Sequence, residues 1–179
     1  MAATAASTHF IPVGEYLGTV YRPDVDYVDG LLEERNVGEV DHGLLQRALV
    51  IMLAALEETH GLFAIPEIRV QVGPTRFRVP DLCLVDEGQL HEPIIRNPPS
   101  LCVEVLSRRD SIGGMRARCQ DYLAMGVPEV WIFDTQTVAV YRMASGLFEQ
   151  VTTANLALRH LDFEINLEKL FAKARKSAK

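Results

Sequence analysis

The order in which the apolar residues change their spacing is the strongest constraint that this sequence places on its fold. From Asp41 to His60 they recur every three or four positions, which is the period of a helix. The next segments alternate as strands do, return to a helical period and then alternate again. These segments are residues 67–72, 76–85 and 101–107 (strands), 111–126 (helix) and 129–134 (strand). The order of helix, three strands, helix and strand predicts an α+β fold with helices packed against a mixed sheet.

The two ends of the chain add further pieces to this core. Two more alternating segments, residues 138–143 and 148–153, predict flanking strands, and residues 167–179 predict a C-terminal helix. Residues 1–23 keep no regular period. We therefore expect an N-terminal arm over residues 1–23 and a single domain over residues 24–179.

The charge of the chain limits what it can bind. Its formal net charge of −6 argues against a general electrostatic attraction to nucleic acid. No lysine precedes Lys169, so any local basic surface in the predicted core consists of arginines. The arginines nearest to the strands and the second helix are Arg76, Arg78, Arg96, Arg108, Arg109, Arg116 and Arg118.

The cysteines and the apolar runs indicate the compartment. Cys83, Cys102 and Cys119 are odd in number and show no metal-binding spacing, so we expect buried free thiols in a reducing cytoplasm. The first ten residues lack the basic start and apolar stretch of a signal peptide. The longest apolar run, residues 48–56, is too short to span a bilayer. We expect a cytoplasmic protein without a membrane segment.

Two acids stand inside apolar strand segments, where a carboxylate is costly. Asp81 follows Pro80 in "RFRVPDLCLV", on the face that also carries Val79 and Cys83, and Glu104 interrupts "LCVEVLS". A buried charge without a partner costs several kcal/mol. An edge position with the carboxylate turned to water would account for either acid alone. Neighbouring strands lie only about 4.8 Å apart, so two acids at matching heights could also share one ion. Mg²⁺ suits such a site because it takes one or two carboxylates.

Four segments of this chain resemble a known group of nucleases. They are "YVDGLLEE", "RFRVPDLCLV", "PPSLCVEVLS" and "YLAMGVPEVWIFD", which lie between about residues 15 and 150. In this order they are similar to the Uma-type putative restriction endonucleases, a branch of the PD-(D/E)XK nuclease superfamily. The resemblance implies a restriction-endonuclease-like αβββαβ core with flanking strands and a C-terminal helix.

The resemblance also implies a metal site. Asp81 and Glu104 would hold Mg²⁺ or Mn²⁺, and Glu34 matches an early acid of this branch that would join them. A solvated acid in "LEERN" is the alternative for Glu34. His42 falls where the family often has a histidine at the start of the first long helix, where capping or packing would explain it equally well.

The sequence departs from the family pattern at the residue that should be a lysine. The superfamily places this lysine two positions after the second acid, but Leu106 follows Glu104 there. Relatives can supply a basic residue from the following helix, where Arg118 and Tyr122 lie one turn apart on one face. Arg118 would then stabilise the charge that develops on phosphate, although its high pKa makes it a poor proton shuttle. An exposed helix arginine is the alternative.

Two functions from different classes remain open on the sequence. The first is a metal-dependent endonuclease that hydrolyses DNA, with phosphate contacts from Arg76, Arg78, Arg108 and Arg109, and we expect such an enzyme to act as a homodimer. The second is a catalytically degenerate member of the same fold that binds DNA or protein. The missing lysine and the acidic net charge favour the second function, whereas the three retained acids favour the first.

Overall fold

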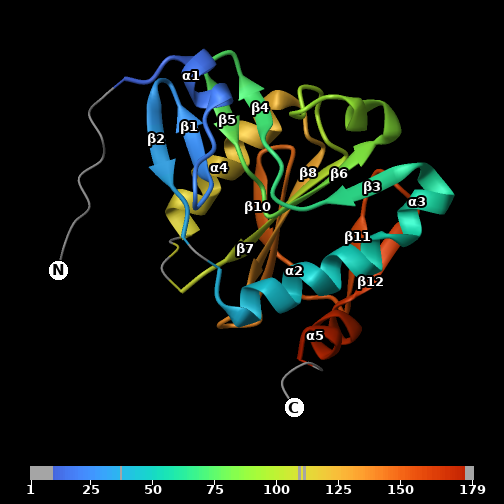
Figure 1. Ribbon diagram of the computed structural model, residues 1–179. Coiled ribbons are helices and arrows are strands. Elements are labelled where there is room, and N and C mark those ends of the chain that lie inside the picture. Colours follow the sequence, from blue (N-terminus) through green and yellow to red (C-terminus); the bar gives the residue numbers. More distant parts are fainter. Residues whose placement is uncertain (1–9, 37, 109, 111, 176–179) are drawn as a thin grey trace.

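The computed structural model describes residues 10–36, 38–108, 110 and 112–175, and its centre is a six-stranded mixed sheet (Figure 1). The strands in sheet order are β10 (Leu147–Gln150), β9 (Val140–Ala144), β8 (Glu129–Asp134), β7 (Leu101–Leu106), β6 (Leu82–Asp86) and β3 (Leu62–Ile65). Only β7 and β8 run parallel among these neighbours. The helix α4 (Ile112–Met125) supplies the crossover that a parallel pair requires.

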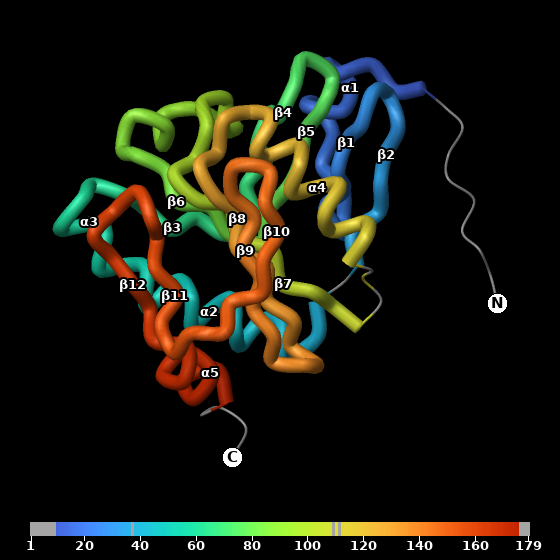
Figure 2. Tube along the Cα trace, turned by 180° about the vertical axis from the view of Figure 1, so that it is seen from behind, coloured from blue at the N-terminus to red at the C-terminus, as the bar shows by residue number. Residues whose placement is uncertain are grey.

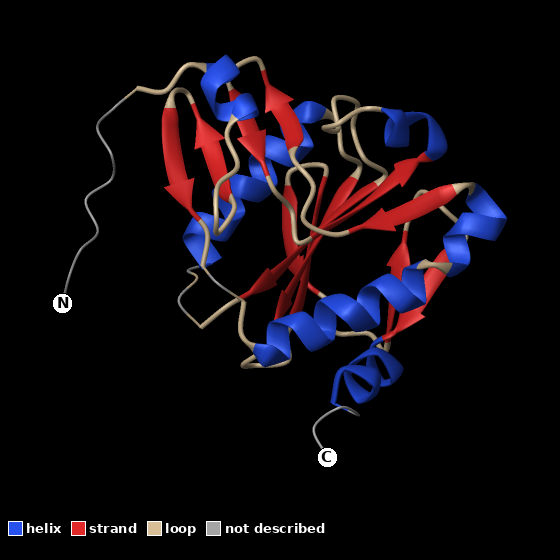
Figure 3. Cartoon of the chain, viewed as in Figure 1, coloured by secondary structure: helices blue, strands red, loops and turns tan. Residues whose placement is uncertain are grey.

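Helices cover both faces of this sheet (Figure 3). The alternation of β7 divides the core, because Val103 and Val105 face one apolar cluster while Cys102 and Leu106 face the other. The first cluster is closed by two helices and a hairpin, and the second by α4. The elements around the first cluster are α2 (Val40–Leu53), α5 (Leu167–Arg175), β11 (Asn155–Leu158) and β12 (Phe163–Asn166). Figure 2 shows the β11–β12 hairpin beside α5.

A second, four-stranded antiparallel sheet stands at one end of the large sheet. Its order is β2 (Leu31–Glu34), β1 (Val25–Val28), β5 (Arg76–Arg78) and β4 (Val70–Gly73). The helix α1 (Val13–Gly18) packs on it through Tyr16, whose ring centroid lies 4.8 Å from that of Tyr27 and 5.4 Å from that of Phe77. Part of the segment expected to be an arm thus contacts this sheet. The division into residues 1–23 and 24–179 stays a prediction.

The structure confirms the predicted α+β fold and corrects two of its strands. Residues 76–85 were expected to form one strand, but the chain breaks at Pro80 and Asp81, so that β5 belongs to the small sheet and β6 to the large one. Proline has no N–H to donate to a ladder, which explains the break. On the side away from β7, β6 pairs with β3, a four-residue strand that the sequence analysis missed. The strand that overlaps residues 67–72, β4, pairs with β5 in the small sheet.

The first predicted helix is also divided. Residues 41–60 form α2 and the short α3 (Ala55–His60), which are interrupted at Ala54 while Leu53 and Leu56 both stay buried. A single 3₁₀ turn, η1 (Glu87–His91), follows β6. None of the described helices combines the length and the apolar character needed to cross a membrane.

Candidate active site

Asp81 lies where the chain passes from the small sheet into the large one. It follows Pro80 and precedes β6, and Leu82 at the start of β6 is paired with Val103 of β7. One step further in this antiparallel register, Asp81 lies opposite Glu104. Its Oδ2 accepts a hydrogen bond of 2.6 Å from the N–H of Val105, so a side chain satisfies the donor where the strand pairing has ended. The two predicted acids are therefore neighbours.

Glu104 is fully buried in the middle of β7. Its Oε1 accepts a hydrogen bond of 2.6 Å from the hydroxyl of Tyr122 on α4, whereas its Oε2 has no hydrogen-bond partner. Burial, together with the negative charge of Asp81, raises the pKa of Glu104 to about 7, against the opposing effect of Arg118. The protein thus holds a fully buried carboxylate with one oxygen that has no hydrogen bond.

Three side chains surround Asp81 from the β2–α2 connection and from α2. Arg35 Nη2 lies 2.6 Å from Oδ1, His42 Nε2 lies 3.3 Å from Oδ2, and Gln46 donates to the backbone carbonyl at 2.7 Å. Burial alone would raise the pKa of Asp81, but the hydrogen bond from His42 and the charge of Arg35 lower it. For His42 burial is the largest single effect and opposes protonation, but the hydrogen bond to Asp81 and the negative charge of Asp81 together raise its pKa. Asp81 is therefore the acid of the pair that ionises at the lower pH.

Arg118 projects from α4 toward Glu104. Its Nη1 lies 3.8 Å from Glu104 Oε2, and its Nη2 lies 3.4 Å from Oδ1 of Asp110. Asp110 in turn accepts hydrogen bonds from the N–H and hydroxyl of Ser107 at 2.8 and 2.7 Å and from Asn36 at 2.7 Å. Asp110 thereby connects the end of β7, the start of α4 and the β2–α2 connection. This junction fixes the direction from which Arg118 approaches.

Two adjoining cavities lie near the acid pair; Asp81 lines one of them, and Glu104 lines neither. One of about 380 Å³ is lined by Asp81, His42 and Arg35, and another of about 530 Å³ is lined by Glu34, Arg35 and Arg108. They share several lining residues. These shared residues are Tyr21, Arg22, Pro23, Arg35 and Asn36. The floor of this double cavity is therefore Asp81, and arginines line its walls.

The acid pair fits a divalent cation on two observations. Oε2 of Glu104 is buried without a hydrogen bond, and such an oxygen is most readily explained by a missing positive ligand. Oδ1 of Asp81 has Arg35 as its one described partner, which leaves a lone pair free on that oxygen. The described residues contain no group of three or more His, Cys, Asp or Glu side chains that could hold a metal. Mg²⁺ can bind through two carboxylates when water and phosphate complete its shell.

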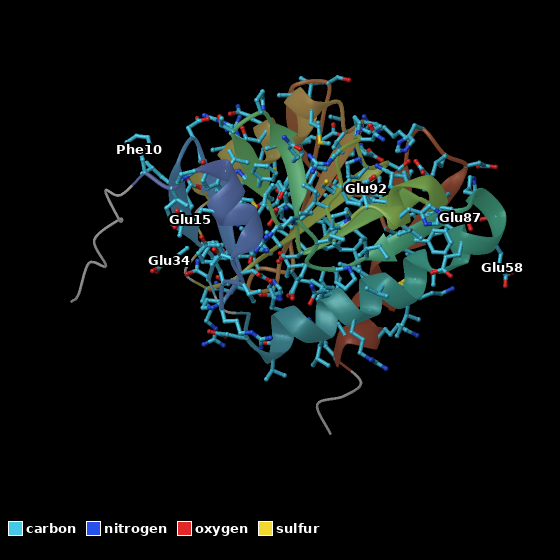
Figure 4. All side chains as sticks on the ribbon, turned by 45° about the horizontal axis from the view of Figure 1, so that its top comes forward. Phe10, Glu15, Glu34, Glu58, Glu87 and Glu92 are labelled. Carbon is cyan, nitrogen blue, oxygen red and sulfur yellow. The ribbon has the colours of Figure 1, made fainter. Side chains whose placement is uncertain are left out.

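The predicted site residues are only partly brought together. Asp81, Glu104 and Arg118 converge, whereas Glu34 is exposed and lies at the outer edge of the molecule, where it lines the larger cavity (Figure 4). Arg109, a predicted phosphate contact, lies outside the described residues.

The predicted phosphate contact of Arg78 is wrong. Its side chain is buried and lies 3.0 Å from Asp26, 2.6 Å from Glu33 and 2.7 Å from Asp121. Arg76 is also paired, with Asp121 at 3.0 Å and with the exposed Asp29 at 2.6 Å. Three carboxylates leave Arg78 no role on a substrate, so this arginine ties β1, β2 and α4 together.

Sequence reasoning missed the residues whose roles depend on burial. Arg35 follows the last residue of β2 and Asp26 alternates with Val25 and Tyr27, so both read as solvated positions. In the structure Asp26 is buried and Arg35 is 12% exposed. Asp110 carried no signal beyond its place before the second helix. His42 was noted at the start of the first helix, and its contact with Asp81 required the tertiary fold.

The fold is similar to that of one solved structure over nearly its whole length. A crystal structure of a "putative nuclease belonging to DUF820" from Anabaena variabilis superposes with a TM-score of 0.79 at 17% sequence identity, over 92% of this chain and 99% of that chain. A cryo-EM structure of a DrdV–DNA complex aligns with a TM-score of 0.39 at 18% identity, over 73% of this chain and 11% of that one. No curated protein matches the sequence.

A family model settles the classification. The model for Uma2, described as "Putative restriction endonuclease", matches residues 19–170, a range that contains both acids, Arg35, His42 and α4. The chain belongs to the Uma2 family.

Proposed function

We propose that the protein is an endonuclease that hydrolyses DNA phosphodiester bonds with Mg²⁺ or Mn²⁺. The family description names a restriction endonuclease, and the fold resembles that of a nuclease structure. The observation that carries the proposal is the neighbouring pair Asp81 and Glu104, because Asp81 lines a cavity and Oε2 of Glu104 is buried without a hydrogen bond. An unsatisfied buried oxygen costs stability, and its position next to Asp81 supports a shared cation as the group that would satisfy it.

Asp81 and Glu104 would hold the metal ion in this proposal, and Glu34 is left out of the ligand set because it is exposed. A bound ion of this kind polarises a phosphoryl oxygen and lowers the pKa of a bound water. Tyr122 on α4 fixes the orientation of Glu104 through its hydrogen bond to Oε1, so that Oε2 is the oxygen turned away from the Tyr122 hydroxyl. His42 and the Val105 N–H fix Asp81 in the same way.

Arg118 would act at the position of the missing lysine. Its guanidinium is 3.8 Å from Oε2 of Glu104 and is anchored by Asp110, so it stays next to the place where phosphate charge would develop. A preorganised cation in a largely buried setting stabilises such charge without reorganising. Because arginine stays protonated, Arg118 would stabilise charge and would not transfer the proton of the attacking water.

A second candidate function is a catalytically inactive DNA- or protein-binding module. The buried Leu106 at the lysine position favours it, since this side chain packs in the α4-side core and offers no donor. The protein groups that already surround Asp81 also favour it. Cleavage by the purified protein separates the two functions.

The proposal includes DNA as the substrate, a homodimer that cuts both strands, and a cytoplasmic location. Three buried cysteines without disulfides are in line with a reducing compartment. A twofold dimer is the usual way for a small protein to present two equal sites. Light scattering at micromolar concentration tests the dimer, and a mass of one 20.0 kDa chain would contradict it.

The test of the function is cleavage of supercoiled plasmid DNA with Mn²⁺ or Mg²⁺, with EDTA as the metal-free comparison. We expect nicking by the wild type with metal and none by Asp81→Asn. Asp162→Asn, in the exposed turn between β11 and β12, serves as the matched control and should cut at the wild-type rate. Absence of cleavage by a folded wild-type protein in both metals, over a panel of sequences, would favour the binding module.

A further inference from the structure

Arg35 lies against the oxygen of Asp81 that a metal ion would bind. Its Nη2 lies 2.6 Å from Oδ1, and its side chain is 12% exposed. The other oxygen, Oδ2, already accepts from the Val105 N–H and lies beside His42 Nε2. A carboxylate oxygen offers two lone pairs, so Oδ1 is the oxygen of Asp81 left open to an ion.

Each acid of the pair already has a guanidinium group beside it. Arg35 lies against Asp81 and Arg118 lies against Glu104, which gives two guanidinium groups for two carboxylates. A divalent ion added to this set leaves an excess positive charge in a buried site, where like charges repel strongly. The excess is relieved when one arginine leaves its acid, when an anion enters, or when both happen together.

Arg35 is the arginine that can leave. It lies in the connection after β2 and outside any helix or strand, and among the described residues it makes one hydrogen bond, although a guanidinium carries five donors. It lines both cavities, and in the larger one it is joined by Arg22 and Arg108. Arg118, in contrast, is held on α4 by Glu104 and Asp110. A turn of the Arg35 side chain carries its charge from Asp81 into a cavity with two further arginines.

We propose that Arg35 is a resident counter-ion of Asp81 that a divalent metal displaces, and that the displaced guanidinium binds a phosphate of the nucleic acid in the adjoining cavity. This inference rests on the proposed function. Arg35 then couples the two ligands, because the metal frees the phosphate-binding group and the phosphate relieves the excess charge that the metal brings. Such coupling is reciprocal by thermodynamic necessity.

The first experiment measures Mn²⁺ binding without nucleic acid, by the electron paramagnetic resonance signal of free Mn²⁺. Arg35→Gln keeps an N–H for Asp81 Oδ1 and removes the charge, so we expect Mn²⁺ to bind about tenfold more tightly than to the wild type. Arg108→Gln is the matched control, since Arg108 lines the same cavity and pairs with Glu39 instead of the acids. Its Mn²⁺ affinity should equal that of the wild type.

The second experiment repeats the Mn²⁺ titration with a short phosphorothioate duplex that resists cleavage. For the wild type we expect the duplex to raise Mn²⁺ affinity about tenfold, and for Arg35→Gln we expect a smaller gain, because the displaced group is missing. The wild-type titration needs no variant, so it tests the coupling even if circular dichroism shows that Arg35→Gln does not fold.

The outcomes separate this inference from the proposed function. Equal Mn²⁺ affinity for folded Arg35→Gln and the wild type overturns the inference, and so does a wild-type affinity that the duplex leaves unchanged. In either case a wild type that binds Mn²⁺ and cuts DNA still supports the nuclease. If the wild type and Arg35→Gln both fail to bind Mn²⁺ and neither cuts, the proposed function fails with the inference.

Discussion

Two buried clusters of carboxylates and arginines lie close together in this protein, and they differ in how completely their charges are paired. In the first, Asp26 uses both oxygens: Oδ1 accepts from the Val79 N–H at 2.9 Å and Oδ2 from Arg78 at 3.0 Å. Arg78 also binds Glu33 and Asp121, so every charged group of the cluster has a partner. This saturated cluster joins β1, β2 and β5 to α4.

The second cluster is the acid pair, and it leaves an oxygen unsatisfied. Glu104 Oε2 has no hydrogen bond, and the nearest cation, on Arg118, is 3.8 Å away. The negative charge of Asp26, in the first cluster, also helps to raise the pKa of Arg118, in the second. Full pairing is what a stabilising cluster requires, and an unsatisfied oxygen beside a second acid that lines a cavity is what a ligand site would show.

The sharpest test of this comparison replaces Glu104, whose Oε2 has no hydrogen bond. We expect Glu104→Gln to lower DNA cleavage by about 10³-fold or more, since several kcal/mol of charge stabilisation are lost with the metal ligand. The melting temperature at pH 8 should not fall, because a buried carboxyl group whose pKa is about 7 is ionised there at a cost that glutamine avoids. Cleavage rates and calorimetric melting on one preparation check both parts. A variant that keeps its activity would refute the role of Glu104.

The opposite result is expected in the saturated cluster. Arg78→Met leaves Asp26 and Asp121 without their shared cation in a buried setting, which should destabilise the fold by about 3 kcal/mol. Urea denaturation followed by circular dichroism measures this loss. Arg76→Met is the control, because Arg76 is half exposed, and should cost less than about 1 kcal/mol. Equal costs for the two variants would remove the distinction between the clusters.

The contrast also explains how much the sequence could predict. Asp81 and Glu104 were visible because each interrupts an apolar segment, and the position of Arg118 on the next helix was fixed by a short connection. The order of α2, β7, α4 and β8 agreed with the apolar spacing of the sequence, whereas the divisions at Ala54 and Pro80 did not show in it.

What the sequence could not supply depends on tertiary contacts. Asp26, Arg35 and Arg78 alternate with apolar neighbours or end a strand, so local pattern places them in water. They are buried because the small sheet packs across the end of α4, and this arrangement follows from the break at Pro80. Strand β3 was missed for another reason, because four residues are too few to establish a period.

Arg118 tests whether the second cluster uses its cation in the way the first one does. If Arg118 acts on phosphate, Arg118→Ala should lower turnover by about 10²-fold while Mn²⁺ affinity at the acids stays the same or rises. Arg118→Lys should keep much of the activity, because lysine supplies the charge that relatives are expected to place there. Single-turnover cleavage and Mn²⁺ titration give the two readouts. Wild-type cleavage by Arg118→Ala would show that Arg118 only neutralises Glu104.

Glu129 is a test of whether a buried oxygen without a hydrogen bond is enough to identify a functional site. It begins β8, its Oε1 accepts from the Arg159 N–H at 3.0 Å, and its Oε2 has no hydrogen bond. Burial raises its pKa to about 7, against the charge of Arg142 and the nearby indole N–H of Trp131, which forms no hydrogen bond with Oε2. The cavities beside Asp81 do not include Glu129 among their lining residues. We therefore expect Glu129 to affect stability and to leave cleavage unchanged.

The sign of its pH dependence follows from the raised pKa. The folded protein holds the proton of Glu129 more tightly than the unfolded chain, whose carboxyl has a pKa near 4.5, so the contribution is full below pH 4.5 and is lost as the pH rises through about 7. Relative to Glu129→Gln, the wild type should lose on the order of 1 kcal/mol between pH 5 and 8. Glu104 contributes equally to both proteins, so the difference in urea unfolding free energy isolates Glu129. A constant difference across this range would show that Oε2 of Glu129 is already satisfied, and lost cleavage by Glu129→Gln would mean that this acid, too, serves the site.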